Sequence, residues 1–405
     1  MPSSAAISAK WHNASLLAGQ RAVFTAAFLA VIAVFGLSLA TKALRAPASA
    51  CALAENFPYK RWFVELNGGA HLVVGRKFCN TVYRAPRGML LTESMGKGRI
   101  EPIADAVADF SRWLAGKQVP FVYVQTPLKI DMEGTMLPAP LVNNGNARAD
   151  SMMALLAEKG VNAVDLRAML TATPGDLERF FYRTDHHWNN DAAFKVFSML
   201  APEIAGAVGD DPSLVAPYVD MASWKRTVWS RCFVGTRSRR TGLLFGGKDD
   251  LAVYAPRFKT EMAMDIISRG ISLSGDFHKT VMWHSNKIWK GGSDGFGRDA
   301  YSLLYIGGIY GVVKHANPGA PLKRRILLVG DSYTRPFEAF LSTVVSDLVV
   351  LDQRRLAPGE TVAGFVESFK PDFVLQMNNP AALVAGTLPG LETHLSVLFT
   401  YGKLE

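Results

Sequence analysis

Three side chains in this chain could together support nucleophilic catalysis: Ser332, His187 and Asp185. A serine hydroxyl is a poor nucleophile on its own and needs an adjacent base, which a histidine imidazole can supply. A carboxylate bound to the second ring nitrogen then fixes the tautomer of that base. Asp185 and His187 are two residues apart, so their side chains share one face of an extended segment. The residue types and spacing therefore predict acyl transfer through a Ser-His-Asp triad.

The sequence around Ser332 predicts the strand, turn and helix that would present its hydroxyl. Residues 326–329 (Ile-Leu-Leu-Val) form an unbroken apolar run, as in a parallel strand buried on both faces. Gly330 and Asp331 break the run, and Pro336 suits the first turn of a following helix. Such a turn also aims backbone N–H groups at a ligand in front of the serine.

The rest of the chain predicts the sheet to which this strand would belong. Helical and strand patterns alternate along much of it, which indicates an α/β fold with a parallel sheet and right-handed crossovers. The predicted helices span residues 101–114, 147–159, 190–204, 336–345 and 361–369, and the predicted strands span residues 119–127, 161–165, 326–329, 348–351 and 373–375.

Two segments depart from this alternation. Residues 62–75 contain Asn67-Gly-Gly69 and predict a hairpin or loop near the start of the domain. Residues 210–317 are rich in Trp, Gly, Arg and Lys and contain few periodic runs. We interpret residues 210–317 as a long insertion of loops and short strands that carries much of any substrate surface.

The N-terminal part predicts a membrane anchor. Residues 22–41 are mostly apolar and contain no charged residue, which just suffices for a helix that spans a bilayer. The stretch is too long for a typical secretory signal, so we predict an uncleaved signal anchor, although small residues at 48–50 leave cleavage open. Residues 42–56 then form a linker, and the globular domain spans 57–405. Basic residues flank the apolar stretch too evenly to orient it.

Composition excludes several classes of protein. The chain has 405 residues, of which 49% are hydrophobic and 20% charged, as in a globular protein and not a disordered one. Its formal net charge of +9 is scattered, and no nucleic-acid-binding motif is recognisable. None of its 3 cysteines forms a Cys-x-x-Cys pair, which argues against structural zinc. Cys79 and Cys232 could form a disulfide or remain free thiols.

These residues resemble a known family. Asp185-His-His-Trp188, followed by Asn189, and the later Gly330-Asp-Ser332 are similar to motifs of the SGNH-hydrolase-like proteins of bacterial exopolysaccharide O-acetylation, the group named for its Asp-His-His-Trp motif. The alginate acetylation proteins AlgJ and AlgX are relatives with the same permuted motif order. Weaker similarities lie at Pro127-Leu-Lys129, Asp165-Leu-Arg167, Phe233-Val-Gly-Thr236, Arg240-Thr-Gly242 and Asp352-Gln-Arg354. The resemblance covers about residue 57 to the C-terminus.

The resemblance implies a three-layer SGNH-like fold and a role for each motif residue. Ser332 would be the nucleophile, His187 the base and Asp185 its orienting carboxylate. Asn378 would help to bind the oxyanion together with the backbone N–H of Ser332, whereas the family's glycine block has no clear counterpart. Further contacts to substrate are expected from three residues: Tyr333, Lys129 and Arg240, although a solvated loop is the default for Arg240.

The resemblance also implies a setting for the protein. Residues 1–21 would lie in the cytoplasm and the catalytic domain outside it, attached to the cell membrane by a single span. The acceptor would be a cell-surface or secreted polysaccharide, and the acetyl group would come from a membrane-bound O-acyltransferase. No cofactor and no metal is expected in the serine mechanism. The predicted reaction is O-acetyl transfer, with carbohydrate acetylesterase activity as the alternative that uses the same residues.

Two other classes of function stay open. Asp185, His186 and His187 could instead be ligands of a metal-dependent phosphoesterase, although the chain lacks an Asp-x-Asp ligand pair. The domain could also be a non-catalytic scaffold that holds polysaccharide for an acetylation complex. In the triad interpretation we expect His186 to point away from its neighbours in a structural role, and Trp188 to serve in packing.

Overall fold

The computed structural model describes residues 33–34, 60–94, 96, 98–289, 300–379, 383 and 399–404. The chain divides into two units, residues 1–66 and 67–405. The central sheet and the candidate site both belong to the second unit.

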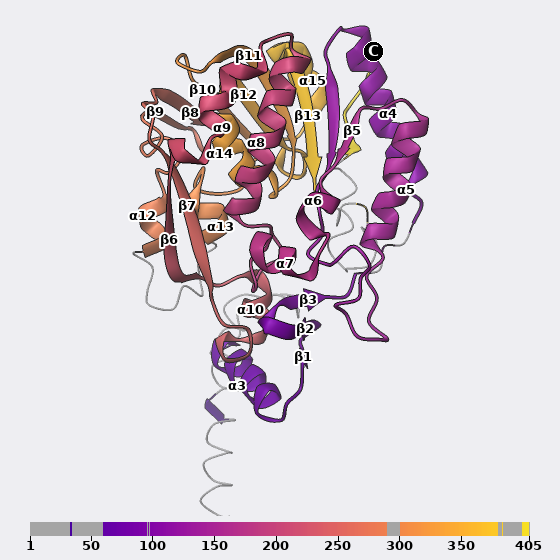
Figure 1. Cartoon of the computed structure of the whole chain (residues 1–405), viewed down its shortest axis with the longest axis vertical. Helices are drawn as coiled ribbons and strands as arrows, with labels where there is room; N and C mark the ends of the chain where they lie inside the picture. The colour runs from indigo at the N-terminus through magenta and orange to yellow at the C-terminus, as the bar shows by residue number, and fades with distance from the viewer. Residues whose placement is uncertain are drawn as a thin grey trace, which may run out of the picture. The chain divides into compact units, whose positions relative to one another are not determined.

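The second unit is built on a mixed sheet of eight strands in the order β5-β4-β13-β11-β12-β10-β8-β9 (Figure 1). Five neighbouring strands are parallel: β5 (Ala163–Asp165), β4 (Phe121–Gln125), β13 (Phe373–Asn378), β11 (Leu322–Gly330) and β12 (Val345–Asp352). Three more extend the sheet beyond β12 in antiparallel pairing: β10 (Val312–Ala316), β8 (Met262–Ile266) and β9 (Ile271–Gly275).

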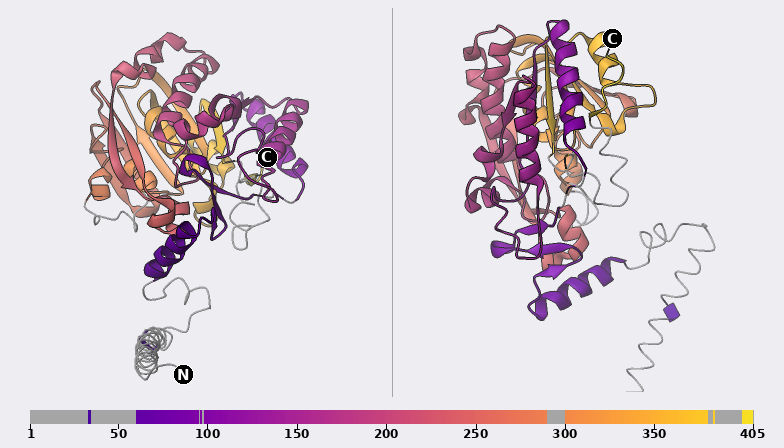
Figure 2. Two further views of the ribbon diagram at one scale, coloured as in Figure 1. Left: turned by 60° about the horizontal axis from the view of Figure 1, so that its bottom comes forward. Right: turned by 90° about the vertical axis from the view of Figure 1, so that its right-hand side faces the viewer.

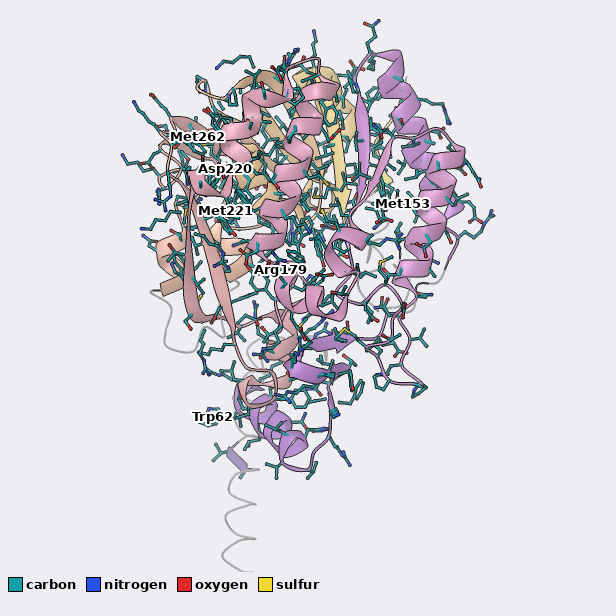
Figure 3. All side chains as sticks on the ribbon, in the orientation of Figure 1. Trp62, Met153, Arg179, Asp220, Met221 and Met262 are labelled. Atoms are coloured by element: carbon teal, nitrogen blue, oxygen red, sulfur yellow. The ribbon has the colours of Figure 1, made fainter. Side chains whose placement is uncertain are left out.

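The α/β prediction is therefore confirmed, but the expectation of a purely parallel sheet is wrong. The three antiparallel strands all come from residues 210–317, which we had interpreted as an irregular insertion outside the sheet. In β8, Met262, Met264 and Ile266 are buried and alternate with half-buried residues (Met262 is labelled in Figure 3). Runs of only five residues carry too little periodicity to stand out against a long segment rich in turn-forming residues.

Helices cover both faces of the sheet (Figure 2, right). The side chains of β11 show why, because Ile326 and Leu328 belong to one apolar core, whereas Leu327 and Val329 belong to another. All four are fully buried, and burial of an aliphatic side chain stabilises a fold by about 1.5–3 kcal/mol. The first core is closed by α8 (Asn190–Ala207) and α14 (Thr334–Leu341), and the second by α4 (Glu101–Gly116), α5 (Gly145–Glu158) and α15 (Val362–Phe369).

Smaller elements complete the described unit. A long antiparallel hairpin is formed by β6 (Trp224–Phe233) and β7 (Asp249–Pro256), with α10 (Thr236–Thr241) and α11 (Leu243–Gly246) between them. A separate small sheet contains β1 (Phe78–Cys79), β2 (Val82–Arg84) and β3 (Leu90–Thr92). Further helices are α6 (Arg167–Thr171), α7 (Pro174–Phe180), α9 (Ala216–Val219), α12 (Ser285–Trp289) and α13 (Ala300–Leu304).

The predicted hairpin or loop at residues 62–75 is instead part of a helix, α3 (Lys60–Val73). Its glycines read as turn signals, but Gly68 has a packing role. A Cβ atom at Gly68 would lie 1.8 Å from the carbonyl oxygen of Thr241 at the end of α10. The helix therefore uses Gly68 for close approach to another backbone, which overrides the poor helix propensity of glycine.

Two predictions concern the N-terminal segment and the cysteines. Among the described residues, no helix combines the length and apolar character that crossing a bilayer requires. The predicted anchor at 22–41 lies outside the described residues apart from 33–34. Cys79 and Cys232 are both free thiols, and burial raises the pKa of each, that of Cys232 to about 11. Cys51 lies outside the described residues.

Candidate active site

Ser332 lies in the turn between β11 and α14, as the sequence predicted. The turn is fixed by Asp331, whose Oδ1 accepts a hydrogen bond from the Tyr333 amide (2.9 Å) and whose Oδ2 accepts one from the Asn379 amide (2.8 Å). Gly330 allows this close approach, since a Cβ there would lie 2.3 Å from the Met377 carbonyl oxygen on β13. Asp331 therefore ties the serine turn to the end of the neighbouring strand.

The Asp-His-His-Trp segment connects α7 to α8 and is bound to the same turn. Asn189 caps α8 by accepting a hydrogen bond from the Ala192 amide (3.0 Å). The fully buried Trp188 donates from its indole nitrogen to the Tyr333 carbonyl (3.0 Å). Tyr333 in turn donates from its hydroxyl to the His186 carbonyl (2.6 Å). Trp188 thus packs as expected, and it also holds the two motifs together.

The structure brings the three predicted side chains into one hydrogen-bonded chain. His187 Nε2 lies 2.8 Å from Ser332 Oγ, and His187 Nδ1 lies 2.6 Å from Asp185 Oδ1. All three residues are buried, with Ser332 the most accessible at 8%. An ionised carboxylate can only accept a hydrogen bond, so Nδ1 of His187 carries the ring proton. Nε2 is then unprotonated and can accept the proton of Ser332. This arrangement can activate Ser332 for attack on an acyl group.

The carboxylate of Asp185 is held by donors on both oxygens. Its Oδ2 accepts from the Thr236 amide (2.6 Å), at the start of α10, and its Oδ1 accepts from the His187 amide (3.1 Å) as well as the ring. Burial alone would raise the pKa of Asp185. Electrostatic interaction with His186 and His187 and these hydrogen bonds outweigh burial, so the pKa of Asp185 lies well below its usual range. Asp185 therefore stays ionised beside His187.

Lys129 lies behind this carboxylate and not on an open rim. It is buried, and its Nζ donates to the carbonyl oxygens of Arg183 (2.7 Å) and Asp185 (2.8 Å). Asp249 supports the same segment by accepting from the Thr184 amide (2.7 Å). Burial lowers the pKa of Lys129 well below its usual range. In this structure Lys129 holds the backbone around Asp185, which differs from the expected contact with substrate.

His186 does not point away from its neighbours, contrary to the expectation from an extended segment. Residues 183–187 form bends instead of a strand. His186 Nδ1 therefore lies 3.1 Å from Thr236 Oγ1 and 3.2 Å from Asp185 Oδ1. Among the described residues, Asp185, His186 and His187 form a group whose potential ligand atoms lie within 4.8 Å of one another. The group would give a metal ion three ligands, but His187 and Asp185 already use these atoms in the triad.

The other predicted contacts differ in their placement. Tyr333 is buried, and its hydroxyl is used by the His186 carbonyl. Asn378 is also buried, and its Oδ1 accepts from Gln376 Nε2 (2.9 Å), whereas its Nδ2 has no hydrogen-bond partner among the described residues. Arg240 is exposed, and its carbonyl accepts from Asn80. No hydrogen bond between these side chains and Ser332 occurs in the described part of the chain.

Two residues that contact the triad were missed as site residues. Thr236 lies within the Phe-Val-Gly-Thr similarity, but nothing in that similarity assigned it to Asp185. Tyr301, on α13, stacks on the His187 ring with centroids 4.0 Å apart and planes at 17°, and its hydroxyl donates to the Ser332 carbonyl (3.0 Å). The sequence around Tyr301 carries no motif, so no signal in one sequence could have found it.

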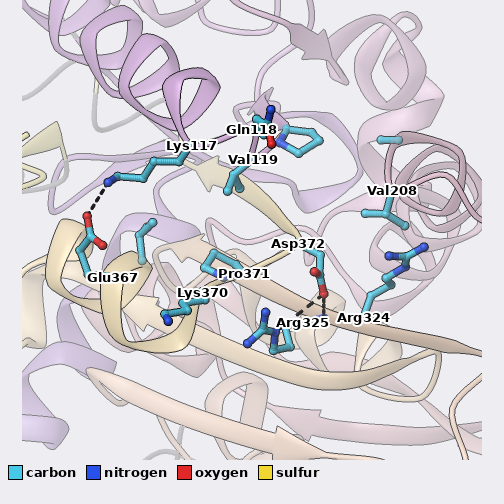
Figure 4. A pocket seen from close by; sticks show the side chains of 13 residues that line it. Lys117, Gln118, Val119, Val208, Arg324, Arg325, Glu367, Lys370, Pro371 and Asp372 are labelled. Atoms are coloured by element: carbon cyan, nitrogen blue, oxygen red, sulfur yellow. Dashed lines mark hydrogen bonds and ion pairs between the residues drawn. The ribbon is translucent and has the colours of Figure 1, made fainter.

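A cavity of about 620 Å³ is lined by the residues that precede β4 and β13 and by Arg324 and Arg325 near the start of β11 (Figure 4). The C-terminal ends of α4, α8 and α15 meet there, where cations compensate the partial negative charge of helix ends. Lys117 pairs with Glu367, and Arg325 lies 3.9 Å from Asp372. These charges therefore have a structural explanation, and the cavity is separate from Ser332.

Comparison with known proteins supports the relationship that the motifs indicate. Residues 86–214 match the family model described as the SGNH hydrolase-like domain of acetyltransferase AlgX. The match includes the Asp-His-His-Trp segment and ends before Ser332. The matched segment is therefore similar to the SGNH hydrolase-like domain of an acetyltransferase. The predicted resemblance is thereby confirmed. No curated protein sequence matches the chain at a significant level.

Solved structures share the fold. The structure of PatB1 from Bacillus cereus has a TM-score of 0.60 and 17% identity, and covers 79% of this chain and 99% of that one. A PatB1 structure with a sulfonyl adduct, also from Bacillus cereus, has a TM-score of 0.59 and 18% identity, and the match covers 78% of this chain and 96% of that one. A DHHW family protein from Eubacterium siraeum has a TM-score of 0.57 and 18% identity, and the match covers 79% of this chain and 96% of that one. At such low identity these similarities establish the common fold alone.

Proposed function

We propose that this protein is an O-acetyltransferase that moves an acetyl group from an ester donor to hydroxyls of a cell-surface or secreted polysaccharide. The observation that carries the proposal is the hydrogen-bonded chain from Ser332 through His187 to Asp185, with distances of 2.8 and 2.6 Å. A scaffold that only holds polysaccharide has no need of these two hydrogen bonds. Ser332 lies 145 residues after His187 in the sequence, and the buried, preorganised geometry of the three residues favours catalysis.

The reaction would proceed in two half-reactions. Ser332 Oγ attacks the carbonyl carbon of the acetyl ester while His187 Nε2 takes the serine proton. The tetrahedral intermediate then collapses, and the leaving oxygen of the donor receives that proton from His187. Ser332 is left as an acetyl ester. In the second half-reaction a sugar hydroxyl gives its proton to His187 and attacks the acetyl carbonyl carbon. The bond between the acetyl group and Ser332 Oγ then breaks, and His187 returns the proton to Oγ, which restores free Ser332.

The developing oxyanion needs hydrogen-bond donors in front of Ser332. The family resemblance assigns this role to the Ser332 amide and to Asn378. Nδ2 of Asn378 is buried and has no partner among the described residues, which supports the assignment because buried polar groups are rarely left unsatisfied. One such donor typically contributes ~10²–10³ in rate. Water and a sugar hydroxyl would accept the acetyl group with the help of the same residues, so acetylesterase activity is the alternative activity of this site.

The proposed setting is the outer side of the cell membrane. Residues 22–41 would anchor the domain, because their 20 residues include no charge and match the thickness of a bilayer. The donor would be a membrane-bound O-acyltransferase that delivers the acetyl group on the same side. Alkaline washing of membranes tests the anchor, since an integral protein stays in the membrane pellet, whereas release of the intact chain would contradict the proposal.

The enzymatic proposal is tested with purified full-length protein in detergent. Ser332→Ala is expected to abolish turnover of an acetyl-ester reporter and acetylation of candidate oligosaccharides, read by mass. The matched control is Ser342→Ala, which removes another buried serine hydroxyl in the turn after α14. Undiminished turnover in a folded Ser332→Ala protein would refute the proposal. Hydrolysis of the acetyl ester without acetylation of any oligosaccharide would show that the protein is an esterase and not a transferase.

A further inference from the structure

We propose that Tyr301 is a positioning residue, which holds the imidazole of His187 and the backbone of Ser332 in their reactive arrangement. This inference rests on the proposed function, because it assigns Tyr301 a part in the activity of the same triad. In the described part of the chain, Tyr301 is the one side chain that both stacks on His187 and hydrogen-bonds to the Ser332 backbone.

The stacking contact restrains the imidazole. The two rings lie nearly parallel, at 17°, with 4.0 Å between their centroids. Rotation of the His187 ring about its Cβ–Cγ bond would drive the ring edge into Tyr301. The contact therefore opposes the motion that would carry Nε2 away from Ser332 Oγ. Tyr301 is 3% exposed, so its ring also keeps water from that face of His187.

The hydrogen bond restrains the nucleophile. The Tyr301 hydroxyl donates to the carbonyl oxygen of Ser332 at 3.0 Å. The same peptide group is also fixed on its N–H side, since the Tyr333 amide donates to Oδ1 of Asp331. Burial raises the pKa of Tyr301 well above its usual range, so the hydroxyl remains protonated and able to donate. One side chain therefore links the orientation of the base to that of the serine.

Neighbouring contacts keep Tyr301 in place. Its ring meets the edge of Tyr182 with centroids 6.0 Å apart. The chain after α13 is fixed by the Ile306 amide, which donates to the Val281 carbonyl (2.7 Å). It is also fixed by Arg335 of α14, whose Nη2 donates to the Tyr310 carbonyl (3.3 Å). Because the segment that follows α13 is tied to α14, the Tyr301 ring can stay in place against His187.

A purely structural role for Tyr301 predicts different results. A core tyrosine that only fills space should affect stability when altered, with kcat following the fraction of folded protein. A positioning residue should affect kcat in the folded protein and leave KM almost unchanged, because it does not touch the substrate. The two roles are separated by kinetics at a temperature where every variant is folded, as judged by circular dichroism.

The experiment compares three variants of the full-length protein. Tyr301→Phe keeps the stacked ring and loses one hydrogen bond, and we expect kcat to fall about 3- to 10-fold. Tyr301→Leu loses both contacts, and we expect a fall of ~10²-fold, typical of small misplacement of reacting groups. In both, KM stays within about twofold of wild type. Tyr305→Phe is the matched control, since among the described residues the buried Tyr305 hydroxyl bonds only to the Tyr254 backbone.

A second readout needs no knowledge of the natural substrate. Phenylmethylsulfonyl fluoride reacts with an activated serine, so its rate of labelling should fall in the order wild type, Tyr301→Phe, Tyr301→Leu. Labelling of folded Tyr301→Leu at the wild-type rate would overturn the inference, as would an equal loss in Tyr305→Phe. If Tyr301→Leu does not fold, an unchanged rate in Tyr301→Phe overturns the role of the hydroxyl. Failure of the proposed function is distinct, because then wild type and Ser332→Ala would behave alike.

Discussion

Asp185 is the residue at which the supports of the site converge. Its Oδ2 accepts from the Thr236 amide, and its Oδ1 accepts from the amide and ring of His187. This arrangement dictates the effect of replacing the carboxylate by an amide. If the oxygen of that amide remained on Thr236, its NH₂ group would face Nδ1 of His187. Nδ1 would then have to be an acceptor, and the proton would move to Nε2.

Asp185→Asn is therefore expected to lower kcat by ~10³–10⁴, because Nε2 in the wrong tautomer cannot accept the Ser332 proton. The fold should persist, since the amide fills the same volume. Steady-state kinetics together with a thermal unfolding curve checks both expectations. A folded variant that keeps more than about a tenth of wild-type kcat would contradict the assigned role of Asp185.

His186 distinguishes the triad from a metal site. A metal centre built on Asp185, His186 and His187 would need a nitrogen of His186 as a ligand, whereas the triad needs only its hydrogen bond to Thr236. Asparagine can reproduce the Nδ1 position with its amide. We expect His186→Asn, and wild type treated with EDTA, to be labelled by phenylmethylsulfonyl fluoride within about 10-fold of the untreated rate. Loss of labelling in both, restored by added metal, would favour the phosphoesterase alternative.

At the scale of elements, the site depends on close approach between backbone segments. Gly235 precedes α10 and lies against the segment that carries Asp185. A Cβ atom at Gly235 would lie 2.4 Å from the carbonyl of Thr184 and 2.5 Å from the Asp185 amide nitrogen. These are backbone atoms that cannot turn aside, so the two segments would have to separate.

Gly235→Ala should therefore lower both stability, by about 1–3 kcal/mol, and kcat, by ~10²-fold, because Asp185 moves with its segment. Gly116→Ala is the control. Gly116 ends α4, and a Cβ there would meet no atom within 4 Å, so alanine should be neutral or stabilise by about 0.5–1 kcal/mol. Chemical denaturation and kinetics of the two variants make the comparison. Equal behaviour of both would contradict the packing argument.

The turn after β11 has a second testable property, its pH dependence. Burial raises the pKa of Asp331 above its ordinary value, although Arg354 and the bonds from the Tyr333 and Asn379 amides oppose the rise. Folding therefore favours the protonated form of Asp331. Its contribution to stability is largest below the unfolded-state pKa of about 3.9 and is lost as pH rises through the folded pKa.

Asp331→Asn isolates this contribution. The free energy of unfolding of wild type minus that of the variant should fall as pH is raised from about 4 toward neutrality, as measured by urea denaturation at a series of pH values. The exposed Asp109→Asn on α4 controls for loss of one charge. A difference that rises with pH would mean that the two backbone hydrogen bonds outweigh burial.

At the scale of the whole molecule, the sequence predicted the parts of the site that follow local rules. An apolar run before Gly-Asp-Ser indicates a buried strand and a turn. The residue types and spacing of Asp185 and His187 predict a base and its orienting carboxylate. Tyr301, Thr236 and the antiparallel strands β8, β9 and β10 were not predictable in this way. They depend on contacts between segments distant in sequence, for which local periodicity carries no signal.

The same limit explains the errors. Gly68 reads as a turn signal because its contact with Thr241 cannot be known from the sequence. His186 was expected to point away from its neighbours because an extended segment was assumed, whereas the chain bends there to reach α10. Lys129 follows a strand end, where ligands often bind, but its ammonium group holds backbone carbonyls. Each error concerns a contact that forms only when the whole fold is assembled.

The central claim is that Ser332, activated by His187, carries the acetyl group. The most direct measurement is mass spectrometry of peptides from protein quenched during turnover of an acetyl ester. The peptide that contains Ser332 should gain one acetyl group in the wild type, and this gain should be absent from Ser332→Ala and strongly reduced in His187→Ala. An acetyl group found on another residue, or turnover with no acetylated intermediate in any variant, would contradict the account.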